Sequence, residues 1–252
     1  MPEEERIAVF DNDGTLWSEK PTYFEGFFIL DRLETLYKTN PVIQQQVQEK
    51  PEFRQLLEKN FTNLHLSGKD ILDLALATHS NITQTEFNSM VEKWPETAQH
   101  PQTHRKFVDM VYKPMIELIR FLDENQFKVF VVTGGGVDFV REALSQVYGI
   151  PHEQIIGSSI KYQYVNISGI NSTIFREPEL NSNDNYDGKP ENIQLHIGEV
   201  PVFVAGNTNE DAETLKYAYH NNKPGKFCYL PICLKDSNII KMKGKEGKLY
   251  AI

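Results

Sequence analysis

The stretch that decides the fold is residues 6–15, which read RIAVFDNDGT. Its first part is a run of apolar, β-branched and aromatic side chains, and such a run is typical of a strand buried in a sheet. The run ends in Asp-Asn-Asp-Gly-Thr, a series of turn-forming residues. We therefore predict a buried strand that delivers Asp11 and Asp13 to a turn at one edge of a sheet.

The second half of the chain repeats this arrangement. Beyond Asn125, two further apolar runs, FKVFVVT at 127–133 and VPVFVAG at 200–206, are each followed by a helix-like segment. A shorter run, QIIGSSI at 154–160, leads into an alternating stretch at 160–176 that predicts a hairpin. Strands that alternate with helices predict an α/β fold with a parallel sheet and right-handed crossovers.

The region between residues 20 and 125 has helical periodicity instead. Ser67 predicts the start of one amphipathic helix, and Thr83 with Glu86 has the capping-box spacing that begins another. Pro114 predicts the first turn of a third helix. This helical block interrupts the predicted sheet after its first strand.

Composition limits the classes of partner. The chain has 252 residues, is 40% hydrophobic, which is enough to bury a core, and has a formal net charge of −9. We expect neither a nucleic-acid nor a membrane partner, because both attract clustered cations and because no apolar run approaches the roughly 18 residues of a membrane span. No N-terminal signal is visible, so we expect a cytoplasmic protein, or a periplasmic or secreted one if the N-terminus was trimmed.

Polar residues follow each predicted strand at its carboxyl end. Asp11 and Asp13 follow the first strand, Thr133 with three glycines ends the second, and Asn207 and Asp211 follow the third. Ligands of open α/β sheets bind beyond these strand ends, so we expect the clusters to meet at one edge. Lys189 lies in the stretch Asp-Gly-Lys-Pro just before the third strand, and we expect it at the same edge.

These residue types suit a metal ion and a phosphate group. Two carboxylates one residue apart repel each other unless a cation or proton lies between them, so Asp11 and Asp13 predict a hard-metal site, most plausibly for Mg²⁺. Thr133 and the glycines after it offer a hydroxyl and main-chain N–H groups at a helix start, which favour an anion. Lys189 supplies a mobile positive charge. Each motif taken alone is compatible with an ordinary turn, a flexible loop or a solvated surface. Because all of them occur in this order next to predicted strands, a functional site is favoured.

The sequence resembles the haloacid dehalogenase superfamily, in its aspartate-nucleophile phosphatase branch, near phosphoserine-phosphatase-like proteins. The resemblance rests on FDNDGTL (10–16), VVTGGG (131–136), Lys189 and GNTNED (206–211). It implies a Rossmann-like three-layer core with a parallel sheet and an inserted α-helical cap. The core would comprise residues 1–18 and 126–252, and the cap residues 19–125, although the last helix of that stretch could belong to the core.

The resemblance also implies a mechanism and a cofactor. Asp11 would attack phosphorus, and Asp13 would act as general acid and base; Thr133, Gly134 and Gly135 would hold the phosphoryl group, and Lys189 would offset its charge. Mg²⁺ would be bound by Asp11, the Asp13 carbonyl, Asn207 and Asp211. The substrate would be a small phosphorylated metabolite, because an acid two residues after the nucleophile favours phosphoryl transfer over dehalogenation.

The fourth motif departs from the family pattern, which has Asp at the position of Asn207. Asn209 and Glu210 are further departures, and an uncharged ligand should bind Mg²⁺ more weakly. Two alternatives therefore stay open: a catalytically weakened binding or regulatory protein on this scaffold, and a phosphotransferase that uses the same residues.

The cap would choose the substrate. Glu19 is the acid best placed to meet a substrate amine, against the alternative of a salt bridge at the surface. Several aromatic residues that follow the first motif are expected to divide between the core and the substrate mouth: Trp17, Tyr23, Phe24, Phe27 and Phe28. We expect His100 and His104, near a proline in a predicted loop, to be solvated.

Overall fold

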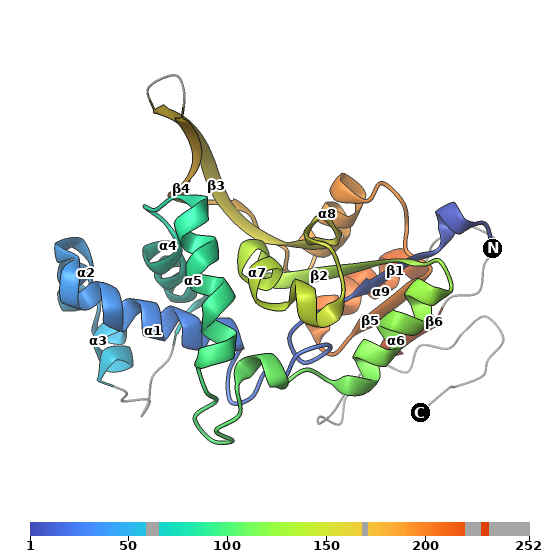
Figure 1. The fold of residues 1–252 in the computed structure, drawn as a ribbon, viewed down its shortest axis with the longest axis horizontal. Coiled ribbons are helices and arrows are strands. Elements are labelled where there is room, and N and C mark those ends of the chain that lie inside the picture. Colours follow the sequence, from blue (N-terminus) through green and yellow to red (C-terminus); the bar gives the residue numbers. More distant parts are fainter. Residues whose placement is uncertain (59–65, 168–170, 220–227, 232–252) are drawn as a thin grey trace.

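A mixed sheet forms the centre of the protein (Figure 1). The computed structural model describes residues 1–58, 66–167, 171–219 and 228–231, and within them the strand order is β4-β3-β2-β1-β5-β6. Neighbouring strands are parallel except for the antiparallel pair β3 and β4. The predicted α/β fold is confirmed. The strands are β1 (Ile7–Phe10), β2 (Lys128–Gly136), β3 (Ile155–Ile167), β4 (Asn171–Ser182), β5 (Phe203–Gly206) and β6 (Cys228–Pro231).

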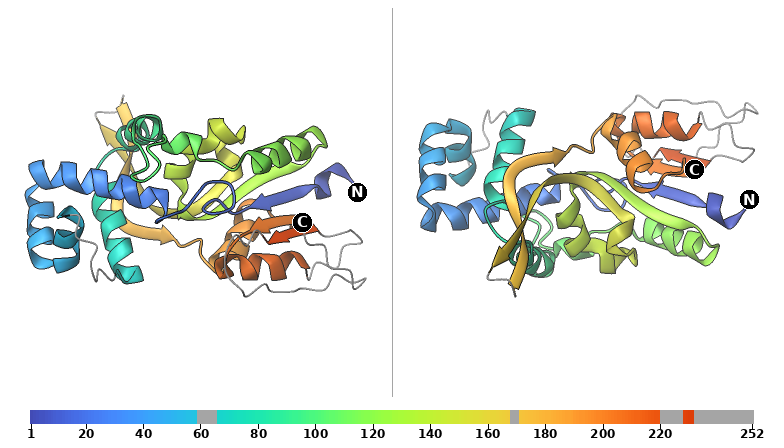
Figure 2. Two further views of the ribbon diagram at one scale, coloured as in Figure 1. Left: turned by 90° about the horizontal axis from the view of Figure 1, so that it is seen from below. Right: turned by 90° about the horizontal axis from the view of Figure 1, so that it is seen from above.

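Helices cover both faces of this sheet, as Figure 2 shows. Successive side chains of a strand point to opposite faces. Ala8 and Phe10 therefore pack against α6 and α7, whereas Ile7 and Val9 pack against α8 and α9. The result is the three-layer, Rossmann-like core. These four helices are α6 (Lys113–Glu124), α7 (Val137–Tyr148), α8 (Gly188–His196) and α9 (Ala212–Tyr219).

Five more helices occupy the sequence between β1 and β2 and lie beyond the carboxyl end of the sheet (Figure 1). Ser67 and Thr83 each form the predicted capping interactions, at the starts of α4 and α5. No helix in the described part of the chain is long and apolar enough to cross a membrane. The five helices are α1 (Phe24–Thr39), α2 (Pro41–Glu49), α3 (Pro51–Leu57), α4 (Gly68–His79) and α5 (Gln84–Thr97).

The hairpin is longer than the sequence predicts. The short strand at 154–160 and the first half of the predicted hairpin form one continuous strand, β3. Its beginning pairs with β2 in parallel, and the remainder pairs with β4. Pairing passes Pro178 and reaches Ser182, because a proline is tolerated in an edge strand, where its missing N–H is not needed. The polar loop before α8 is correspondingly shorter, at residues 183–187.

Arg176 of β4 connects the hairpin, the helical block and α7. Its side chain is almost completely buried. Nε donates to the main-chain oxygen of His79 at 2.6 Å, and Nη1 donates to Oε1 of Gln84 at 2.7 Å and pairs with Asp138. The guanidinium also lies 3.8 Å from the centre of the Phe87 ring. One side chain therefore joins three parts of the structure that are distant in sequence.

We predict that Arg176→Met lowers the free energy of unfolding by about 3 kcal/mol, because the buried Asp138 carboxylate loses its nearest cation and keeps only the Tyr162 hydroxyl and the more distant Arg141. Urea unfolding monitored by circular dichroism measures this change. Lys161→Met is the matched control, since Lys161 forms only exposed ion pairs on the same hairpin, with Glu177 and Glu179. Equal losses for the two variants would contradict a special role for Arg176.

Candidate functional site

The first candidate residues lie in the tight turn after β1. Asp11 continues the strand, and its N–H donates to the main-chain oxygen of Ala205 at 2.9 Å. The carbonyl of Asn12 then accepts from the amides of residues 15, 16 and 17, which closes the turn. Gly14 has a φ of +80°, and a Cβ there would lie 1.9 Å from Nδ2 of Asn207. Only glycine fits this position, because the backbone is left-handed and the side chain of Asn207 fills the space.

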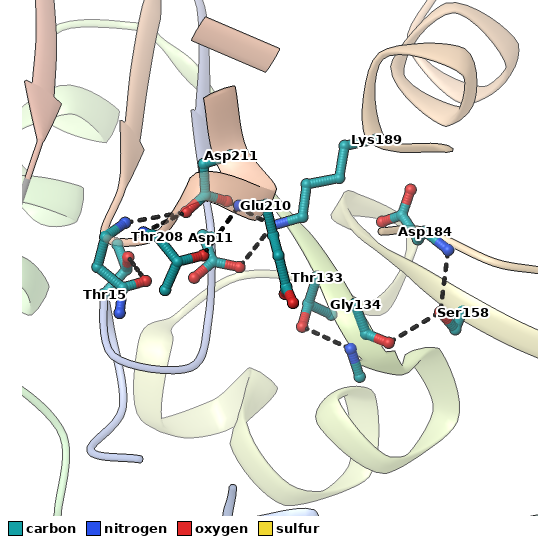
Figure 3. A network of polar contacts seen from close by, with 12 residues as sticks. Asp11, Thr15, Thr133, Gly134, Ser158, Asp184, Lys189, Thr208, Glu210 and Asp211 are labelled. Atoms are coloured by element: carbon teal, nitrogen blue, oxygen red, sulfur yellow. Dashed lines mark hydrogen bonds and ion pairs between the residues drawn. The ribbon is translucent and has the colours of Figure 1, made fainter. Parts of the chain in front are cut away.

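A buried lysine joins two of the strand ends (Figure 3). Nζ of Lys189, at the start of α8, lies 2.7 Å from Oδ1 of Asp11 and 2.6 Å from Oδ1 of Asp211. The other oxygen of Asp211 accepts from the amides of Asn207 and Thr208, at 2.9 and 3.0 Å. Sequence motifs separated by nearly 200 residues therefore meet at one point, where the prediction placed them.

The electrostatics of this group follow from burial and charge. Burial raises the pKa of Asp11, Lys189 lowers it and Asp211 raises it again, which leaves it at about 6. Burial lowers the pKa of Lys189, but the charges of Asp11 and Asp211 outweigh this effect, so its net pKa is raised and the amine stays protonated. Asp11 is thus a carboxylate held in place by a permanent cation.

Asp13 differs chemically from Asp11. Burial, followed by the charge of Asp11, raises its pKa to about 8, with smaller contributions from Glu25 and Glu19. The nearby side-chain amide of Asn12 opposes this shift. Two neighbouring carboxyl groups with separated pKa values can divide the roles of nucleophile and proton donor.

The glycine-rich segment at the end of β2 lies beside this pair. Thr133 is buried, and its Oγ1 accepts from the amide of Gly135 at 3.0 Å, which leaves the hydroxyl hydrogen free to point elsewhere. The register between β2 and β3 shifts between Thr133 and Gly136, so the segment leaves the regular ladder. A Cβ on Gly134 would lie 1.9 Å from Oδ1 of Asn185. The absence of a side chain therefore lets the two loops touch.

The distances around the side-chain amide of Asn207 show whether a metal ion fits between it and the first motif. The end of its amide lies 3.0 Å from the Asp13 carbonyl oxygen and 3.1 Å from Oδ2 of Asp11. If the nitrogen faces these oxygens, it donates to them. If the oxygen does, it lies about 3 Å from each of these two oxygens, which is the edge of an octahedron with metal–oxygen distances of about 2.1 Å. The donor set suits Mg²⁺, with the amide oxygen turned inward.

The described residues contain no set of three His, Cys, Asp or Glu side chains with the geometry of a metal site. A metal at this point therefore depends on an amide oxygen and a main-chain carbonyl. Both carboxylate oxygens of Asp211, predicted as a ligand, are engaged by Lys189 and by the amides of Asn207 and Thr208.

Comparison with known proteins identifies the family. Residues 5–191 match the haloacid dehalogenase-like hydrolases. The chain belongs to this family. No curated protein sequence matches it.

Solved structures are similar to this hydrolase at low sequence identity. A Bordetella pertussis Tohama I protein of unknown function has a TM-score of 0.55 at 12% identity, with 84% of this chain and 86% of that one covered. A phosphoserine phosphohydrolase-like protein from Francisella tularensis has a TM-score of 0.44 at 17% identity, over 85% and 83%. A probable phosphoserine phosphatase from Vibrio cholerae has a TM-score of 0.42 at 12% identity, over 86% and 55%.

Acidic side chains lie close to the candidate site. Glu19 lies against the turn after β1, with its Cδ 2.9 Å from the point where a Cβ on Gly14 would lie, and it pairs with Lys20 at 3.3 Å. Glu25, in the first turn of α1, accepts from the amide of Gly136 at 2.9 Å. Tyr23 is exposed, although part of its side chain is buried. This burial, together with the charges of Glu210 and Glu19, raises the pKa of Tyr23 to about 12.

Glu25 is a residue that the sequence did not predict. Its second oxygen lies 3.4 Å from Nε2 of buried His79, in α4. Neither residue belongs to a motif, and Gly136 is 111 residues from Glu25. Helical periodicity presents Glu25 as an ordinary acid in a first turn, so no local signal could have revealed its contact with the glycine loop.

The prediction that some of the aromatic residues after the first motif lie in the core is confirmed. Trp17, Phe24 and Phe28 are buried in the core, whereas Tyr23 is exposed.

The expectation for His100 is wrong. It is buried beside Phe24, and its Nε2 lies 2.7 Å from the main-chain oxygen of Lys20, so it supports the loop that carries Glu19.

We predict that Lys189→Met destabilises the metal-free protein by about 3–5 kcal/mol at pH 8, because two buried carboxylates then face each other without a cation. The loss should shrink toward pH 5. Without Lys189 the folded-state pKa of Asp11 rises further above its unfolded value, so the folded state binds more protons in this window and stability falls as pH rises.

Denaturant unfolding in chelator at several pH values measures this dependence. Lys93→Met, at an exposed position of α5, is the control and should show no such pH dependence. A loss for Lys189→Met that is the same at pH 5 and pH 8 would contradict the electrostatic account.

Proposed function

We propose that the protein is a Mg²⁺-dependent phosphomonoester hydrolase that acts on a small phosphorylated metabolite through an aspartyl-phosphate intermediate. The observation that carries the proposal is the pairing of Asp11 with buried Lys189, beside a second carboxyl group, Asp13, whose pKa is about 8. This arrangement supplies an oriented nucleophile and a proton donor at neutral pH.

In the first step, an Asp11 carboxylate oxygen forms a bond to phosphorus as the bond to the leaving oxygen breaks. Asp13 transfers its proton to that oxygen, so the alcohol departs neutral. In the second step Asp13 takes a proton from water, whose oxygen attacks phosphorus. The acyl-phosphate bond breaks, and phosphate and the Asp11 carboxylate are released. The two residues thus return to their starting states.

Other residues hold the phosphoryl group. The hydroxyl of Thr133 is free to donate to a phosphoryl oxygen, because its own oxygen already accepts from Gly135. The Gly134 amide lies in the same segment, and Gly135 fixes the Thr133 side chain in this role. Lys189 balances the negative charge that accumulates near Asp11.

Mg²⁺ would be held by the Asp11 carboxylate, the Asp13 carbonyl and Asn207, and when bound it supplies positive charge that stabilises the phosphoryl oxygens in the transition state. Asp211 supports this set by orienting Lys189 and the amides of Asn207 and Thr208. In this arrangement Asp211 acts on the metal site mainly through its neighbours.

Three acidic side chains near the site favour a leaving group that carries positive charge. Glu19 and Glu25 act on Asp13, and Glu19 and Glu210 act on Tyr23. Carboxylates in this position repel an anionic leaving group and attract an amine. Glu19 and Glu25 are the residues we propose to meet it.

We predict that the purified protein hydrolyses an aryl phosphate and amine-bearing phosphomonoesters with Mg²⁺ present, and that chelation abolishes turnover. Asp11→Asn should lower kcat by roughly 10³-fold or more, because it removes the nucleophile. Phosphate release measures both effects, and Asp123→Asn, on the exposed surface of α6, is the control. Absence of turnover across a broad phosphometabolite panel would contradict the proposal.

One observation supports a different function. Asn207 is uncharged at the position where a charged ligand would bind the metal most tightly, and this favours a binding or regulatory protein with little activity. Calorimetry separates the two. We predict that wild-type protein binds Mg²⁺ and beryllofluoride together, and that Asn207→Asp tightens Mg²⁺ binding by about tenfold, near 1.4 kcal/mol. Failure of the wild type to bind the pair would favour the regulatory alternative.

A further inference from the structure

A fully buried carboxyl group, Asp184, lies outside the roles described so far. It is in the loop between β4 and α8, and none of its surface is exposed. Oδ1 accepts from Nδ2 of Asn192 at 2.9 Å, but Oδ2 is buried without a hydrogen-bond partner among the described residues. Burial is the main cause that raises its pKa to about 7. A buried carboxyl that is only partly satisfied is costly, so its presence calls for a reason.

Asp184 connects the two elements that would hold the phosphoryl group, and Figure 3 shows its link to one of them, the Gly134 segment. Its amide donates to Oγ of Ser158 at 2.9 Å, and that hydroxyl donates to the carbonyl oxygen of Gly134 at 2.8 Å. On the other side, Asn192 lies one turn after Lys189 in α8. The charge of Lys189 also acts on Asp184 and lowers its pKa. A single residue thus links the glycine segment of β2 to the helix that carries the lysine.

Other residues of the loop between β4 and α8 also bear on the glycine segment of β2. The side chain of Asn185 fills the space above Gly134. Tyr186 has a φ of +50°, a left-handed conformation that is strained for an aromatic residue. The loop keeps this shape while the bonds of Asp184 hold it to Ser158 and α8. The structure therefore maintains a strained loop against the proposed phosphate site.

We propose that Asp184 is a positioning residue that fixes Lys189 and the Gly134 main chain on either side of the phosphoryl group. The inference rests on the proposed function, because it needs a phosphoryl group at this site. Asp184 does not touch the substrate in this account. It acts by keeping two contacts at the separation that the transition state requires, where small displacements are costly.

The test compares Asp184→Ala with Asp187→Ala. Asp184→Ala removes the oxygen that accepts from Asn192. Asp187 lies in the same loop, but it is exposed and makes no capping hydrogen bond with its side chain. We predict that Asp184→Ala lowers kcat/KM by about 10- to 100-fold. The factor should be the same for substrates with different leaving groups, and inhibition by inorganic phosphate should weaken. Asp187→Ala should match the wild type in each measurement.

A purely structural role would give a different result. It would lower the unfolding temperature of Asp184→Ala and leave phosphate inhibition unchanged in assays well below that temperature, and this outcome would overturn the proposal. If Asp184→Ala does not fold, Ser158→Ala replaces it, since it interrupts only the link to Gly134 and should also weaken phosphate inhibition. Active wild-type enzyme with an unaffected Asp184→Ala refutes this inference alone, whereas inactive wild-type enzyme refutes the proposed function and this inference with it.

Discussion

The ion pairs of Lys189 with Asp11 and Asp211 are the constraint on which the site depends. All three groups are buried, and burying any one of them alone would be strongly unfavourable. They are tolerable only together, so the carboxyl ends of β1 and β5 and the start of α8 must meet within hydrogen-bond distance of one another. The Rossmann-like core provides this meeting point, because the carboxyl ends of its parallel strands lie along one edge. The fold therefore brings the three charges together, and the three charges in turn hold these parts of the fold in contact.

Asp11, Asp13, Thr133 and Lys189 could be found from the sequence because each follows or precedes a strongly apolar strand or belongs to a compact motif. Strand order then brings them together, and the structure confirms that Asp11, Lys189 and Asp211 meet. Capping residues such as Ser67 and Thr83 were equally predictable, since their hydrogen bonds are local. The core of the site could thus be predicted from local sequence patterns and from the rule that ligands bind at the carboxyl ends of parallel strands.

Glu25, Asp184 and His100 were not predictable in the same way. Glu25 reaches the glycine loop only through the way α1 packs, and Asp184 is buried in the loop after a hairpin strand that extends to Ser182. His100 lies in an irregular, polar stretch that resembles a surface loop, yet it packs against Phe24 and Phe27 of α1, which are distant in sequence, and against nearby Phe107. Burial produced by long-range packing has no periodic signature in the sequence, so it cannot be inferred from spacing.

The central claim, that Asp11 is a nucleophile supported by Lys189 and a metal ion, is tested most directly by a crystal structure with Mg²⁺ and beryllofluoride. Our account predicts beryllium bonded to a carboxylate oxygen of Asp11. It also predicts Mg²⁺ held by Asp11, the Asp13 carbonyl and Asn207, with Lys189 and Thr133 directed at the fluorides. Beryllofluoride bound elsewhere, or an Asp11 carboxylate that remains free while Mg²⁺ binds at another position, would contradict it.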